Sequence, residues 1–108
     1  MSLQSEMAEA VHQRLAHGAV SVAALVREVR ERWGPEHSVG SVHLFVEEML
    51  YCLLREADVD VACAAAGGLV PWKLPADEAW EKISERLRRL HEFLEDDEWC
   101  CLRKKLLG

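Results

Sequence analysis

The sequence has no long apolar run and no excess of positive charge. Its most apolar stretch, residues 61–72, contains two glycines and a proline, so it falls well short of the roughly 18 apolar residues that a membrane helix needs. The 13 basic residues are outnumbered by 19 acidic ones, which gives a formal net charge of −6. Nucleic acid and anionic membranes attract positively charged surfaces. The composition therefore argues against both as partners.

Proline and glycine are also scarce, with three and six residues in a chain of 108 that is half apolar. This composition excludes the disordered and collagen-like classes. The length supports one hydrophobic core, so we expect residues 1–108 to form a single domain.

The spacings that are typical of metal and catalytic sites are missing as well. Four cysteines and five histidines form no C-x₂-C, H-x₃-H or H-E-x-x-H pattern. Pairing of the predicted strands would bring Cys63, Cys100 and Cys101 close together, yet a small core residue explains the positions of Cys63 and Cys101 equally well. Gly67–Gly68 is better explained by a turn than by a phosphate-binding loop. We therefore expect no enzyme activity, no metal and no cofactor, and the sequence identifies no small-molecule substrate.

The cysteines and the opening residues bear on the cellular compartment. The chain opens with Glu6 and Glu9 and without the basic start of a signal peptide. Cysteines in a protein that is not exported are usually reduced thiols. We therefore expect a cytoplasmic protein that does not enter a membrane.

Apolar residues at helical spacing predict four helices. The clearest covers residues 21–33, with Ser21 as its N-cap and Gly34–Pro35 at its end. The other three are expected at about 4–17, 42–55 and 75–94. Ser41 is suited to cap the third helix, which is apolar over most of its circumference and is therefore expected to lie at the centre.

After the third helix the apolar period changes from 3.6 to 2. Residues 58–64 alternate as a half-buried strand does. Residues 66–68 supply a turn, and residues 69–72 supply a return strand that Pro71 places at an edge. A further strand is predicted at 99–103. Pairing it with the first strand makes every neighbour antiparallel, in the order 2-1-3.

These elements predict an α+β fold with four helices and a three-stranded antiparallel sheet. In the central strand we expect an inward face of Val59, Val61 and Cys63 and a solvated face of Asp58 and Asp60.

Three helices followed by a β-hairpin resemble the winged-helix arrangement. The resemblance rests on residues 20–26, 42–55 and 58–72. It implies DNA binding, with the third helix in the major groove and the hairpin on the backbone or in the minor groove. However, that helix carries Glu47 and Glu48, and the hairpin tip has no lysine or arginine. A winged-helix transcriptional regulator is therefore the alternative interpretation.

Two groups of residues are candidates for contact with a partner. Leu69, Val70 and Trp72 lie on the predicted edge strand, where tryptophan is favoured in protein contacts. Basic residues gather at Arg86, Arg89, Arg103, Lys104 and Lys105, either as a patch for an acidic partner or nucleic acid or as a solvated helix face. The acidic run at 95–98 is interpreted as a solvated linker.

The leading hypothesis is a small non-enzymatic protein-binding or regulatory domain, such as an adaptor or an immunity-type protein. It would bind a protein partner or form a homodimer through the hairpin edge and its acidic faces.

Overall fold

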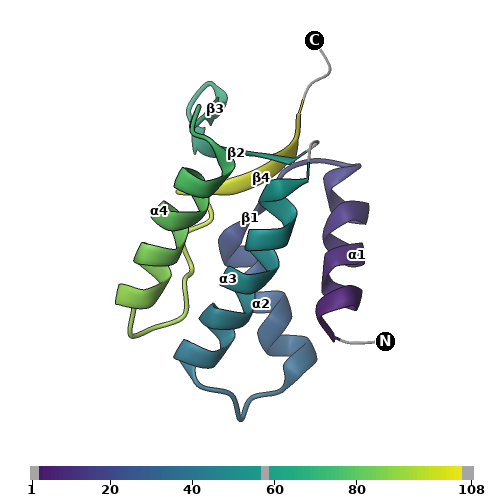
Figure 1. Ribbon diagram of the computed structural model, residues 1–108, viewed down its shortest axis with the longest axis vertical. Helices are drawn as coiled ribbons and strands as arrows, with labels where there is room; N and C mark the ends of the chain where they lie inside the picture. Colours follow the sequence, from purple (N-terminus) through teal and green to yellow (C-terminus); the bar gives the residue numbers. More distant parts are fainter. Residues whose placement is uncertain (1–2, 57–58, 106–108) are drawn as a thin grey trace.

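The computed structural model describes residues 3–56 and 59–105, which form an α+β fold (Figure 1). In chain order the elements are α1 (Leu3–Leu15), β1 (Val20–Ser21), α2 (Val22–Trp33), α3 (Val39–Arg55), β2 (Val59–Ala65), β3 (Gly68–Pro71), α4 (Ala76–Arg89) and β4 (Cys101–Lys104).

The strands form one antiparallel sheet in the order β1-β4-β2-β3. The predicted order, in which the first hairpin strand lies between the second and the last, is confirmed. The predicted number of strands is wrong, because β1 adds a fourth strand on the outer side of β4. Leu102 lies opposite both Val61 of β2 and Val20 of β1. A strand of two residues is too short to show an alternating pattern in the sequence.

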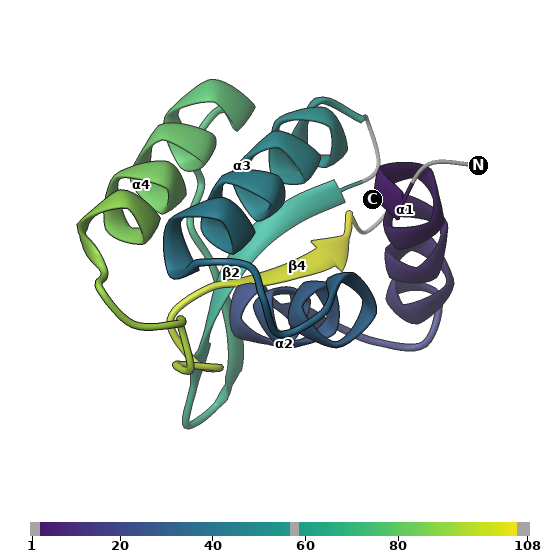
Figure 2. The same ribbon diagram turned by 90° about the horizontal axis from the view of Figure 1, so that it is seen from below.

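The helices pack on one another below the sheet. In both views α3 lies between α1 and α4, and in Figure 1 the strands β2, β3 and β4 gather at one end of these helices (Figures 1 and 2). All four helices and the strands β1, β2 and β4 contribute buried apolar residues to one hydrophobic cluster. None of the helices in the described residues is long and apolar enough to cross a bilayer.

The ends of α2 follow the predicted signals. Ser21 Oγ accepts a hydrogen bond from the Ala24 N–H, 3.0 Å away, as an N-cap does. At the other end Gly34 adopts a positive φ of 106°, a conformation that glycine tolerates and other residues rarely adopt. Its N–H donates to the Arg30 carbonyl and completes the last turn.

The start of α3 lies earlier than predicted. Ser38, and not Ser41, is the N-cap, and its Oγ accepts a hydrogen bond from the Ser41 N–H. The first turn therefore contains Gly40, which is a poor helix former and suggested a connector in the sequence.

The end of α4 also differs from the prediction. The helix stops at Arg89, and Leu90 is extended, although Leu90 and Leu94 continue the apolar spacing. The Leu94 N–H donates to the buried ring of His43 instead of to a helical carbonyl. Leu94 still reaches the core, where it is buried, and this explains why its position fits the helical period.

The two faces of β2 are less different than predicted. Val59 and Val61 are buried as expected, and Cys63 is half-buried. Ala62 on the opposite face is fully buried, and Asp60 is half-buried beside Arg103. The expected solvated face is therefore wrong for the described residues, and Asp58 lies outside them.

Candidate functional site

The hairpin β2–β3 presents the predicted contact residues on two different faces. Val70 lies opposite Cys63 and Leu69 lies opposite Ala64. Because successive side chains of a strand point to opposite faces, Val70 and Trp72 share the face of Cys63, whereas Leu69 lies on the other face. Val70 is 49 % exposed and Leu69 36 % exposed, while Trp72 is half-buried. The three side chains therefore form no single flat patch, because they point to both faces of the hairpin at and just after β3.

The outer edge of β3 has little capacity for backbone pairing. The Trp72 N–H donates to the Val61 carbonyl, so Trp72 and Val61 are a hydrogen-bonded pair between the two chain segments of the hairpin. In an antiparallel sheet, hydrogen-bonded pairs alternate with pairs whose backbone N–H and C=O groups point away from the partner strand. Leu69 and Pro71 therefore turn their backbone groups away from β2. Since proline has no N–H, Leu69 alone supplies an outward donor within β3.

Trp72 belongs to an aromatic pair that the sequence did not reveal. Its ring lies 5.6 Å from that of Trp99, which is 27 residues further along the chain. The Lys82 ammonium lies 4.3 Å from the Trp72 ring, and the Arg86 guanidinium lies 4.2 Å from the Trp99 ring. Cations over indole faces are attracted by the ring quadrupole. Lys82 and Arg86, which are one helical turn apart on α4, therefore hold the rings against the helix.

The opposite flank of α4 covers α3 along its length. At one end Asp77 pairs with Arg55 of α3, and at the other the Leu87 carbonyl contacts His43 of α3. Between them the Trp80 Nε1–H donates to a main-chain carbonyl of α3, and Arg88 pairs with a buried carboxylate. A helix that reads DNA presents an open face to the major groove. The exposed residues among the first ten of α3 are Gly40, Ser41, Leu44 and Glu48, which include no cation.

The predicted basic cluster does not form one patch. Arg86 pairs with Asp96, Arg89 with Glu85, and Arg103 with Asp60. Lys105 lies beside Ala76 and Ala79 at the start of α4, whereas Arg89 lies roughly 15 Å away at its end. Proximity in the sequence therefore suggested a cluster that the fold separates.

The acidic run at 95–98 is more than a solvated linker. Asp96 accepts hydrogen bonds from the Glu98 and Trp99 N–H groups and pairs with Arg86, and these contacts lower its pKa. Asp97 accepts a 2.6 Å hydrogen bond from Ser21 and one from Arg27, which likewise lower its pKa. Both aspartates therefore anchor the segment between α4 and β4.

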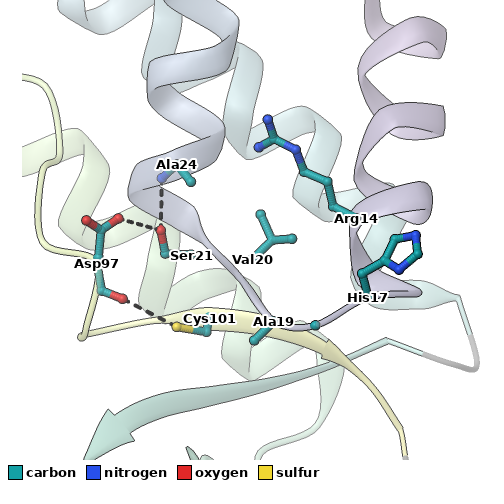
Figure 3. A pocket seen from close by; sticks show the side chains of 9 residues that line it. Arg14, His17, Ala19, Val20, Ser21, Ala24, Asp97 and Cys101 are labelled. Atoms are coloured by element: carbon teal, nitrogen blue, oxygen red, sulfur yellow. Dashed lines mark hydrogen bonds between the residues drawn. The ribbon is translucent and has the colours of Figure 1, made fainter.

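An open surface hollow of about 540 Å³ lies between the end of α1 and β1 (Figure 3). Figure 3 shows Asp97, Ser21 and Cys101 on one side and Arg14 and His17 on the other. The Cys101 thiol contacts the Asp97 carbonyl, and Arg14 pairs with Glu28. Most polar side chains here are thus engaged in contacts that hold the fold together, so the hollow offers no set of converging free groups for catalysis.

Three cysteines lie near one another around β2 and β4: Cys63, Cys100 and Cys101. Cys100 and Cys101 are buried, whereas Cys63 is half-buried. Burial, followed by the neighbouring Cys101, raises the pKa of the Cys100 thiol. Burial also raises the pKa of Cys101. A thiolate is the form that binds metals and attacks electrophiles. No group of three or more metal-ligating side chains occurs within residues 3–56 and 59–105.

Comparisons with protein families, with curated proteins and with solved structures find no match to this chain. The function is therefore inferred from the surface of the molecule.

Proposed function

We propose that this chain is a non-enzymatic protein-binding or regulatory domain that docks through its β2–β3 hairpin. The observation that supports this proposal is the exposure of Val70 and Leu69 on β3, an edge strand. Exposed apolar side chains on a projecting edge are typical of protein contacts. Burying the exposed half of Val70 contributes about 1 kcal/mol, so a partner must also contact the surroundings of the hairpin.

The docking mode follows from Pro71. A partner strand that joined β3 would find one outward N–H, at Leu69, and none at Pro71. Edge strands that carry proline are protected from pairing with further strands. The hairpin is therefore better suited to side-chain contacts than to extension of the sheet, which favours a protein partner over a sheet-to-sheet homodimer.

The experiment uses matched serine substitutions. Val70→Ser removes an exposed apolar residue from the hairpin, and Leu44→Ser removes one of similar exposure (51 %) from α3. Tagged wild type and both variants are isolated from extract of the native cells with mass spectrometry, and their self-association is measured by sedimentation velocity. The proposal expects an association that Val70→Ser weakens and Leu44→Ser retains. An association that both variants retain, or none at all, contradicts it.

A further inference from the structure

The arginines and lysines of this chain differ in their partners. Within residues 3–56 and 59–105, every arginine except Arg30 lies within 4 Å of a carboxylate, and the Arg30 guanidinium lies over the Phe93 ring. None of the lysines in these residues makes an ion pair. They are Lys73, Lys82, Lys104 and Lys105. Lys73, Lys104 and Lys105 therefore carry the positive charge that is most available to a partner, whereas Lys82, like Arg30, lies over an aromatic ring.

These lysines gather where β3 leads into α4. Lys73 directly follows Trp72, and the Lys82 ammonium lies over the same indole ring. Lys105 lines a small hollow together with Leu74. Lys104 lies opposite Val59 at the adjoining end of the sheet. We call these four residues, with Trp72 and Leu74, the lysine surface.

The lysine surface combines its charge with exposed apolar groups. Leu74 is 37 % exposed, and Val70 of the hairpin lies on the same strand face as Trp72. Lys73 holds a positive φ of 57°, which costs a residue other than glycine about 1 kcal/mol. This turn places the Lys73 and Leu74 side chains in solvent. A partner that fits the surface therefore carries both negative charge and apolar side chains.

We propose that the lysine surface binds a short acidic segment of a partner protein, one that contains apolar side chains. This inference rests on the proposed function and names the chemistry of the partner. The chain as a whole has a net charge of −6, so an unpaired cationic surface on it selects for a local and opposite charge. Nucleic acid fits less well. A duplex carries one charge per roughly 1.7 Å and would extend beyond the lysines over acidic faces.

The test uses synthetic probes and purified full-length protein. The first probe is a fluorescent peptide of roughly ten residues in which Glu and Leu alternate, a length that matches the span of a short strand. In two control peptides Gln replaces Glu or Ser replaces Leu, and the last probe is a duplex DNA of mixed sequence. Anisotropy is measured at roughly 50 and 200 mM salt, because screening weakens charge contacts between exposed groups.

Matched variants separate local charge from net charge. Lys73→Ser/Lys105→Ser and Arg89→Glu both lower the net charge by the same amount, but Arg89 lies on the outer side of α4 and is strongly exposed. We expect the Glu–Leu peptide to bind about tenfold more tightly than either control peptide. The lysine double variant should lose about tenfold in affinity, and Arg89→Glu should lose less than about twofold. Equal binding of the Glu and Gln peptides, or equal effects of the two variants, overturns the inference. Tighter binding of the duplex than of the peptide reassigns the surface to nucleic acid.

The partner that is isolated with the tagged protein separates docking through the β2–β3 hairpin from binding of an acidic segment by the lysine surface. A partner that is lost with Val70→Ser but retained with Lys73→Ser/Lys105→Ser overturns the acidic segment and leaves the proposed function intact. An association that neither variant weakens overturns the proposed function, whereas the peptide measurement still decides the chemistry of the lysine surface.

Discussion

The Leu94 N–H donates a hydrogen bond to Nε2 of His43, 3.2 Å away and 51 residues earlier in the sequence. The other ring nitrogen lies 3.1 Å from the Leu87 carbonyl, so Nδ1 carries the proton of the neutral ring, an assignment made from these partners. One buried side chain thus joins α3, the end of α4 and the segment that leads to Trp99. This arrangement needs the neutral imidazole, because a protonated ring cannot accept a hydrogen bond from Leu94.

Stability should fall in acid because of His43. Burial lowers the pKa of His43 below 6.5, against the opposing effects of the Leu87 carbonyl and Glu47. The unfolded chain therefore binds this proton more readily than the folded one. The contribution of His43 is complete above about pH 6.5 and is lost as the pH falls below that value, by at most about 1.4 kcal/mol per pH unit. Urea unfolding between roughly pH 5 and 8 measures this slope.

Two variants test the assignment to His43. His43→Gln cannot titrate and should flatten the slope, even though it lowers stability at every pH. His91→Gln changes an exposed histidine and should leave the slope of the wild type. The idea loses its basis if His43→Gln keeps the full acid sensitivity.

Two adjacent arginines should differ strongly in their effect on stability. Arg88 pairs with Glu47, whose side chain is 3 % exposed, whereas Arg89 pairs with the well-exposed Glu85. Arg88→Ala leaves a buried carboxylate without its counter-charge and should cost about 2 kcal/mol. Arg89→Ala removes a surface ion pair and should cost less than about 0.5 kcal/mol. Denaturant unfolding at neutral pH compares them, and equal losses would show that the pair to Glu47 is unimportant.

Asp97 and Glu95 of the acidic run should differ in their contribution to stability. Asp97 accepts hydrogen bonds from Ser21 and Arg27 and so ties the segment before β4 to the start of α2. Asp97→Ala should lower the free energy of unfolding by about 1 kcal/mol, a modest value because the site is exposed. Glu95→Ala, two residues earlier and exposed, should change it by less than about 0.5 kcal/mol. Thermal unfolding of both variants checks the contrast, and equivalent shifts contradict it.

Duplex DNA should bind weakly. The exposed residues among the first ten of α3 include Glu48 and no cation, and α4 covers one flank of that helix. We expect a dissociation constant above about 10⁻⁵ M near physiological salt, within the range of sequence-independent binding. Anisotropy with a labelled duplex measures it. Submicromolar binding with a steep salt dependence would instead support the winged-helix alternative.

The sequence predicted the elements whose signals are local. The stripe of α2 and its Ser21 cap depend on residues within a few helical turns, and the start of strand spacing at β2 depends on neighbouring residues, although the solvated face expected for β2 is wrong. The missed features depend on contacts between distant residues. β1 exists because Val20 pairs with Leu102, and α4 ends early because His43 binds the Leu94 N–H.

The candidate surface shows the same division. Leu69 and Val70 could be placed on an edge strand from the position of Pro71 alone, whereas Trp72 lies just beyond the end of β3. The sequence could not predict the contact of Trp72 with Trp99 or the ion pairs of the arginines, because these partners come close only in the folded chain. The sequence therefore could not separate the lysines, which form no ion pair in the described part of the chain, from the arginines, all but one of which do.

Pro71 should protect the hairpin from pairing with a second copy. The backbone nitrogen of position 71 faces away from β2 but carries no hydrogen, because the residue is proline. Pro71→Thr therefore adds a second outward N–H donor beside that of Leu69 on β3. Val70→Thr introduces the same residue one position earlier, where the N–H faces β2 and the outer edge gains no donor. An edge with regularly spaced donors is a template for another strand. We expect Pro71→Thr to shift the chain toward dimers or larger species in sedimentation velocity at roughly 100 μM, a concentration at which weak edge pairing becomes visible, and Val70→Thr to sediment no faster than wild type. If Pro71→Thr sediments like wild type, Pro71 is not what prevents β3 from pairing with another strand, and docking through side chains is no longer favoured over extension of the sheet.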